Sequence, residues 1–281
     1  MFFFLSFFVI WLVVVMCFLS NYLVWWSIFI LMTLIFVFLG KEGCSFKSCL
    51  NYFVIQESLG LIFLVFCGSA AQLFLVMMKV GVAPFHFWLF SVTDGFMDFL
   101  LIWFMTFRKL PFFPVLVCLG SSILLFLLVF GIFLCYTQFF VLKGAKNLFI
   151  ISSTESFSWV FMIFMLSMSG TFFLFFYYLL LMVFLFPKLG SGETSYISWE
   201  TLLVFLNVPF SVSFFIKIFS LGQVLFLDSL LFLFVLFVMC FSVFSLSLFL
   251  VNMSFRDFMK NEGGLKMIYF VLYFGTLVTL V

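Results

Sequence analysis

Long apolar runs separated by short polar segments dominate the chain. Phe2–Leu19 and Leu230–Val251 each contain 18 or more residues without a charge. A helix needs about 20 predominantly apolar residues to cross the ~30 Å hydrocarbon core of a bilayer. A membrane barrel would instead alternate polar and apolar residues over short strands. The pattern therefore predicts transmembrane helices.

The same reading along the whole sequence predicts an all-α, polytopic bundle of about 10–11 spans in a single integral membrane domain, 1–281. The polar stretches between the spans, of which Gly40–Cys49, Lys188–Ser198 and Asn252–Leu265 are the longest, have the length of linkers rather than of soluble domains. The expected spans are 2–20, 22–40, 51–67, 69–90, 97–119, 121–141, 147–166, 170–187, 200–227, 228–251 and 265–281.

Composition excludes a soluble enzyme. Of the 281 residues, 68% are hydrophobic and only 8% are charged, whereas a soluble domain has about a quarter of its residues charged. The formal net charge of +2 gives no reason to expect a nucleic-acid partner. Phenylalanine occurs 54 times, whereas alanine occurs only at positions 70, 71, 83 and 145. A T-rich coding strand would produce this bias, which favours an organelle genome.

Basic residues indicate the orientation of the spans. They occur in segments that follow even-numbered spans, and the loops after odd-numbered spans contain none. By the positive-inside rule, the N-terminus and the basic loops are expected on the cytoplasm-like side, which is the matrix in a mitochondrion. The basic loop residues are Lys41, Lys47, Lys143, Lys146, Lys188, Arg256, Lys260 and Lys266.

Three lysines do not fit this loop pattern, because Lys79, Lys109 and Lys217 lie inside the expected spans four, five and nine. A lysine at the centre of a bilayer costs about 2.5–3.5 kcal/mol even on the mildest scale. A row of buried lysines, coupled through water and through each other's charge, can pass protons along the membrane plane. The alternative is that each lysine extends its ammonium group to the membrane surface.

Helix breakers accompany two of these lysines. Gly81 and Pro84 interrupt span four, and Asn207 and Pro209 interrupt span nine. Two broken helices in one bundle are typical of ion sites in repeat-built transporters. Proline kinks that only aid packing are the alternative, and the lysines in the same two spans favour function.

His86, Glu57 and Glu155 are further candidates for proton transfer. His86 is the only histidine, and its side chain titrates near neutral pH, although a single histidine is more often an interior residue with satisfied hydrogen bonds. Glu57 and Glu155 are the carboxylates expected within the early and central spans, where either could instead cap or anchor a helix end.

Motifs for other chemistry are missing from the sequence. It contains neither a GxGxxG nor a P-loop pattern, so no directly bound nucleotide is expected. The spacing of the seven cysteines matches no metal or iron–sulfur pattern, and no metal site is predicted.

The run MKVGVAPFHFW at Met78–Trp88 closely resembles the broken-helix signature of the chain 2 family, one of the antiporter-like families of membrane subunits in respiratory complex I, the NADH–ubiquinone oxidoreductase of mitochondria. Further segments are similar to that family in the same order, so that the resemblance covers nearly the whole chain. They are Asn51–Gln56, Val92–Gly95, Thr106–Pro111, Ser152–Ser153 with Trp159, and Pro209 with Lys217.

This resemblance implies a subunit of the inner-membrane arm that contributes to proton translocation. Lys79, Lys109 and Lys217 would belong to its central polar axis, and His86 would connect to that axis. The partners would be other membrane-arm subunits and lipids. No cofactor is expected on this chain, since the FMN and iron–sulfur clusters of the holoenzyme, and its substrate ubiquinone, would be held elsewhere. A free-standing cation/proton antiporter, and a structural subunit whose proton path has decayed, are the alternatives.

The sequence also departs from the family pattern. The family has a glutamate on the second span that pairs with the lysine at the Lys79 position, and Phe29 falls there instead. A family histidine near the serine pair is also missing, with Glu155 and Ser156 in that region. We expect Glu57 or Glu155 to supply the compensating negative charge.

Overall fold

The computed structural model describes residues 2–66, 68–141 and 145–166, together with Phe234, Phe237, Phe241 and Phe244. These residues form α-helices connected by short loops, and no strand occurs among them. The helices are α1 (Phe2–Phe18), α2 (Tyr22–Gly43), α3 (Phe46–Val65), α4 (Ser69–Val80), α5 (Phe87–Thr93), α6 (Asp98–Thr106), α7 (Phe112–Cys118), α8 (Ser122–Val141) and α9 (Ala145–Leu166). The expected spans beyond 166 lie outside the described residues, and so do Lys217, Asn207 and Pro209.

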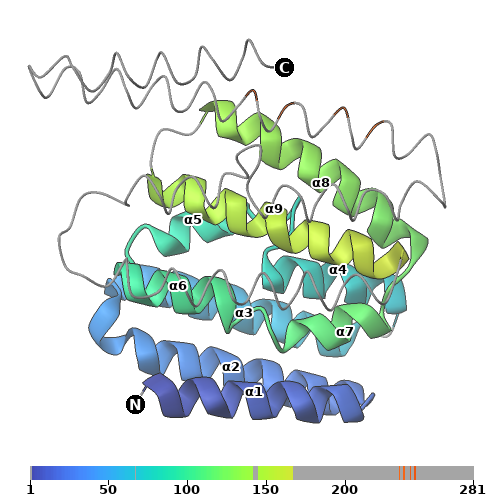
Figure 1. Ribbon diagram of the computed structural model, residues 1–281. Coiled ribbons are helices and arrows are strands. Elements are labelled where there is room, and N and C mark those ends of the chain that lie inside the picture. The colour runs from blue at the N-terminus through green and yellow to red at the C-terminus, as the bar shows by residue number, and fades with distance from the viewer. Residues whose placement is uncertain are drawn as a thin grey trace, which may run out of the picture.

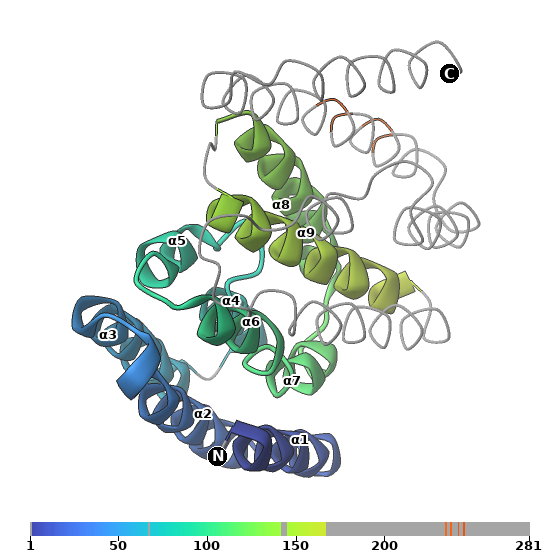
Figure 2. The ribbon, with the colours of Figure 1, turned by 60° about the vertical axis from the view of Figure 1, so that its left-hand side comes forward.

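The helices stack in three layers, which Figure 2 shows. One outer layer contains α1, α2 and α3, the middle layer contains α4 to α7, and α8 and α9 form the other outer layer, seen at the opposite side from α1 and α2 in Figure 1 as well. Figure 2 shows the first layer curving around the middle one. Contacts between α3 and α4, between α2 and α6, and between α5 and α9 join the layers. The middle layer is therefore enclosed on two sides by helices.

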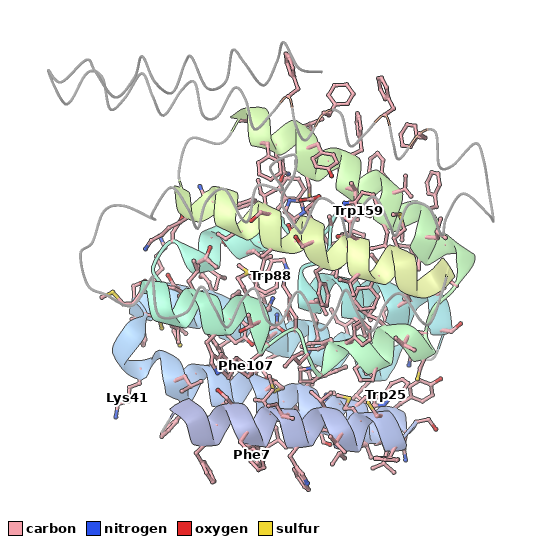
Figure 3. All side chains as sticks on the ribbon, in the orientation of Figure 1. Phe7, Trp25, Lys41, Trp88, Phe107 and Trp159 are labelled. Atoms are coloured by element: carbon pink, nitrogen blue, oxygen red, sulfur yellow. The ribbon has the colours of Figure 1, made fainter. Side chains whose placement is uncertain are left out.

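Two helices, at Tyr22–Lys41 and Phe46–Val65, are both long enough and apolar enough to cross a membrane. The outer surface of both outer layers is apolar as well: Phe4 and Phe7 of α1 and Phe126 of α8 are each more than 70% exposed. Figure 3 shows Phe7 pointing away from the helices and Lys41 at the outer edge of the bundle. These features are compatible with a helical membrane protein.

The start of α3 corrects the expected boundary. The sequence predicts that span three begins at residue 51, but α3 begins at Phe46 because Ser45 caps it with a side-chain hydrogen bond from the Ser48 N–H. Serine at the N-cap accepts a hydrogen bond from one of the first free N–H groups of a helix. The segment Gly40–Cys49, expected as a linker, is therefore mostly helical.

Both spans of the middle layer are interrupted. In the first, α4 ends at Val80 and α5 begins at Phe87, with Gly81 and Pro84 between them; we call this segment, 81–86, break one. In the second, α6 ends at Thr106 and α7 begins at Phe112; we call this segment, 107–111, break two. The sequence analysis expected one continuous span at 97–119, so break two corrects it. Figure 1 shows α5 and α6 towards one end of the bundle and α4 and α7 towards the other, so that both breaks lie between the ends.

Loops that follow even-numbered spans meet at one end of the bundle. The Ser45 N–H donates to the Gly95 carbonyl (2.9 Å), and the Met97 N–H donates to the Gly43 carbonyl (2.9 Å), which joins the α2–α3 and α5–α6 loops. At the start of α9, Lys146 donates to the Phe96 carbonyl (3.1 Å). The described basic loop residues thus lie on one side of the helices.

Candidate functional site

Three cations are buried in the middle layer. Lys79, Arg108 and Lys109 are each only 1% exposed, although their surroundings are mainly apolar and aromatic. Lys79 lies in the last turn of α4, immediately before break one, and the other two lie within break two. Buried charges are rare unless partners compensate them, so the contacts of each cation indicate what it does.

Lys79 extends towards α2 and α3. Its Nζ atom lies 5.0 Å from the centre of the Phe29 ring, and a methyl group added at Gly60 of α3 would approach Nζ to 3.1 Å. A cation over an aromatic face is attracted by the ring electrons. Phe29, which stands where the family has a glutamate, therefore contacts Lys79. The absence of a side chain at Gly60 leaves room for the ammonium group.

Glu57 is the carboxylate beside this lysine. It lies one turn before Gly60 on α3 and accepts a hydrogen bond from Thr33 of α2 (2.7 Å). Its charge attracts the Lys79 ammonium group. Thr33 lies one turn beyond Phe29 on α2. The negative charge near Lys79 thus comes from α3, while α2 contributes an aromatic ring and a hydroxyl.

The carbonyl groups at the end of α4 have partners from three other segments. The Lys79 carbonyl accepts from Gln56 Nε2 (3.1 Å) and from Arg108 Nη1 (3.1 Å). The Val80 carbonyl accepts from Arg108 Nη2 (2.7 Å), and the Met78 carbonyl accepts from Trp88 Nε1 (2.9 Å). The last carbonyls of a helix have no partners within it, so these side chains satisfy groups that break one leaves open.

Lys109 extends away from Lys79, towards α9. Its Nζ atom donates to the Ser153 carbonyl (3.3 Å) and lies 5.0 Å from the centre of the Phe157 ring. Arg108 and Lys109 are adjacent in sequence, yet the first contacts α4 and the second contacts α9. Break two therefore directs one cation to α4 within the middle layer and the other to α9 in the neighbouring layer.

His86 lies at the end of break one, where it precedes the first residue of α5. Its side chain is fully buried, its Nε2 forms a hydrogen bond with Gln138 Oε1 of α8, and its ring stacks on Phe87. The charge of Lys109 acts on the His86 ring. The histidine is thus on the Lys109 side of the site and links it to α8.

Glu155 occupies a separate position between α8 and α9. Its Oε1 atom accepts from Tyr136 (2.8 Å) and from Trp159 Nε1 (3.0 Å), and the side chain is 1% exposed. Of the two carboxylates expected to compensate Lys79, Glu57 is the one whose charge acts on this lysine.

Cys44, one of two neighbouring cysteines, has a thiol that its surroundings make less reactive. Cys44 and Cys49 are both free thiols near the α2–α3 loop. Burial and the neighbouring Cys49 raise the pKa of the Cys44 thiol to about 12. A thiolate is the reactive form of cysteine, so Cys44 is inert near neutral pH.

Comparison with known proteins gives relatives over nearly the full length. The chain is 54% identical over 270 residues to "NADH-ubiquinone oxidoreductase chain 2" of Ascaris suum, a match that covers 96% of this chain and 90% of the relative. The chain belongs to the NADH-ubiquinone oxidoreductase chain 2 family. A chain 2 protein of Caenorhabditis elegans is 46% identical over 271 residues, 96% of each chain. No family model matches the sequence.

The sequence did not indicate several residues that hydrogen-bond the candidate site residues of this chain 2 family member. Arg108, Gln56, Thr33 and Gln138 were not among the candidates, although each bonds at or beside a proposed site residue. A signal for Arg108 existed, because an arginine within an apolar run is as unusual as the lysine beside it. The other three are uncharged, and only the contacts between helices identify them.

Proposed function

We propose that the chain is a subunit of NADH-ubiquinone oxidoreductase that contributes to proton translocation across the mitochondrial inner membrane through buried lysines. One observation carries the proposal: Lys79 and Lys109 are buried at two helix breaks in the interior of an apolar bundle. Membership of the chain 2 family supports the assignment to the complex.

The contacts suggest an order of proton transfer. Glu57 attracts the charge of Lys79, Arg108 bonds the Lys79 carbonyl and precedes Lys109 in the chain, and Lys109 acts on His86, which bonds to Gln138. A proton released by one lysine ammonium passes through water to the next group, and the lysine returns to charge when it accepts another. Each such step moves only a proton between side chains and water, and no electron is transferred. This chain therefore needs no redox chemistry of its own.

The remaining expectations belong to the same proposal. The chain would form a polytopic, antiporter-like bundle of about 10–11 spans, with the N-terminus and the basic loops on the matrix side. The meeting of the α2–α3 loop, the α5–α6 loop and Lys146 at one end supports this topology. Exposed aromatic side chains such as Phe4 and Phe126 would face lipid or other membrane-arm subunits, and those partners of the complex would hold the FMN and the iron–sulfur clusters.

The direct test is Lys79→Met in the intact complex, reconstituted in sealed vesicles. The number of protons pumped per NADH oxidised is expected to fall severely, because methionine fills the space without carrying a proton. Lys41→Met is the matched control, since Lys41 is exposed at the end of α2. Pumping that is unchanged in the Lys79 variant would favour a structural subunit with a decayed proton path.

A native gel of gently solubilised membranes tests the assignment to the complex. Migration of this chain with a large NADH-oxidising assembly is the expected result. A small, inactive band, with the active complex elsewhere on the gel, would favour a free-standing cation/proton antiporter. That alternative also predicts ion–proton exchange by the isolated chain in liposomes.

A further inference from the structure

Arg108 connects the two breaks. Its backbone lies in break two, and its guanidinium group donates to the last two carbonyls of α4, Lys79 O (3.1 Å) and Val80 O (2.7 Å). The carbonyl end of a helix carries a partial negative charge that favours a cation. The planar fork of arginine can donate to two acceptors at once, which a single ammonium group does less well. The observed contacts therefore use both the charge and the planar shape of the arginine side chain.

Aromatic rings hold this guanidinium group in place. Its central carbon lies 4.0 Å from the centre of the Phe104 ring, 4.9 Å from that of Trp88 and 5.9 Å from that of Tyr52. Arginine stacks favourably on aromatic faces and stays charged under all physiological conditions. The site thus contains a positive charge whose position and protonation are both fixed.

Both lysines experience this fixed charge. Arg108 repels the ammonium group of Lys79, to whose carbonyl it is bonded, and that of Lys109, its neighbour in sequence. The other titratable groups around these three cations are Tyr52 and Glu57 of α3, His86, and Cys135 of α8. Among them Glu57 attracts Lys79, so the repulsion is balanced on the Lys79 side by a carboxylate.

We propose that Arg108 is a positioning residue for proton transfer between Lys79 and Lys109. Its guanidinium group fixes the end of α4, from which the Lys79 side chain extends, and its permanent charge disfavours the protonated form of each lysine. Each lysine therefore releases its proton more readily than it would without Arg108. This inference rests on the proposed function, and it adds a group that never carries the transferred proton.

Two substitutions separate charge from shape. Arg108→Gln keeps an N–H donor and removes the charge, so proton binding by both lysines is favoured. Arg108→Lys keeps the charge but replaces the planar guanidinium group, which donates to two carbonyls, with a single ammonium group. Both are measured in the intact complex in sealed vesicles, as protons pumped per NADH across a range of pH. Lys146→Gln is the matched control, because Lys146 also donates to a backbone carbonyl but is exposed at the end of the bundle.

The expected results differ between the two variants. In Arg108→Gln, the pH at which pumping declines moves upward by about one unit, since a tenfold change in proton affinity corresponds to one pH unit. In Arg108→Lys, that pH stays unchanged, and the rate of pumping falls several-fold because the end of α4 is held less firmly. The Lys146 control leaves both quantities unchanged.

Several outcomes would overturn the inference. Native pumping and a native pH profile in Arg108→Gln would show that its charge is not used, and a native rate in Arg108→Lys would show that the fork is not used. Failure of both variants to assemble would assign Arg108 to folding alone. If Lys79→Met loses pumping while both Arg108 variants keep it, only this inference fails; if Lys79→Met also pumps normally, the proposed function fails with it.

Discussion

Break one and break two interrupt neighbouring spans, but different interactions stabilise them. At break one, Gln56, Trp88 and Arg108 reach across from other segments to bond the carbonyls of α4. At break two, backbone hydrogen bonds close successive tight turns, with Lys109 N–H to Thr106 O (3.1 Å) and Leu110 N–H to Phe107 O (3.3 Å). Break one has backbone turn hydrogen bonds as well, from Val82 N–H to Met77 O (3.1 Å) and from Phe85 N–H to Val82 O (2.8 Å). The two breaks therefore differ in that side chains from other segments also bond the carbonyls at break one.

This difference separates two tasks. The tight turns of break two set the backbone from which the Arg108 and Lys109 side chains extend, and contacts with α4 and α9 then hold these side chains. A break bonded from outside can respond to the charge and position of its partners, as the proposed proton transfer through Lys79 would require. Substitutions that disturb break one from other helices should therefore have larger effects than substitutions in break two at residues other than Arg108 and Lys109.

The largest effect is expected from Gly131→Ala on α8. A methyl group at Gly131 would overlap the carbonyl group of Ala83 in break one, which is backbone and cannot move aside. Such overpacking typically costs about 1–3 kcal/mol or more. We expect roughly tenfold less assembled complex on a native gel. Gly68→Ala is the control, because nothing lies within 4 Å of the added methyl group there. Equal assembly of the two variants would contradict the close packing of α8 on break one.

The next largest effect is expected from Glu57→Gln. The amide can still accept the hydrogen bond from Thr33, but it removes the negative charge that acts on Lys79. The ammonium form of Lys79 then loses this attraction, and protons pumped per NADH should fall several-fold in reconstituted complex. Asp94→Asn, at an exposed carboxylate, should have no effect. Native pumping in Glu57→Gln would remove Glu57 from the proton path.

A double variant sharpens this test. Phe29 contacts Lys79 from α2, so Phe29→Glu in the Glu57→Gln background returns a carboxylate to the lysine from the other helix. If only the charge beside Lys79 matters, pumping should recover in part, as measured in the same vesicles. No recovery in an assembled complex would mean that the carboxylate acts from α3 alone.

Much of the helical framework follows from the sequence alone. The expected spans 2–20, 22–40 and 121–141 agree within a few residues with α1, α2 and α8, because uninterrupted apolar runs determine them. Break one was expected because Gly81 and Pro84 are strong breakers, and Gly81 adopts a left-handed conformation (φ 74°) that suits glycine. Break two was not expected, although Pro111 was a signal, because the apolar run continues past it.

The site was harder to predict than the framework. Burial of Lys79 and Lys109 follows from their place in apolar runs. The choice between Glu57 and Glu155 does not, because it depends on which helices are neighbours in space. The same holds for Arg108, whose acceptors lie 28 and 29 residues earlier in the chain. Contacts between helices carry this information, and neither periodicity nor composition contains it.

A smaller effect is expected from Gln56→Leu. The substitution removes one of two side-chain donors to the Lys79 carbonyl, and Arg108 Nη1 remains. A hydrogen bond of this kind contributes about 1 kcal/mol. The temperature at which half of the complex loses NADH oxidation should fall by a few degrees. Gln72→Leu on α4 is the control, since Gln72 is buried and its Oε1 has no hydrogen-bond partner within the described part of the chain. A native temperature for Gln56→Leu would show that Arg108 alone holds the carbonyl.

The smallest effect is expected from Pro111→Ala in break two. Pro111 has a φ of −65°, which alanine also adopts, so the substitution mainly adds freedom to the unfolded chain and costs about 0.4–1 kcal/mol. The backbone hydrogen bonds of Lys109, Leu110 and Phe113 do not involve the proline nitrogen and should persist. Assembly on a native gel and protons pumped per NADH should both stay close to native. A loss as large as that of Gly131→Ala would mean that the proline, and not the turn hydrogen bonds, separates α6 from α7. Arg108 and Lys109 would then keep their directions only because the proline prevents a continuous helix through break two.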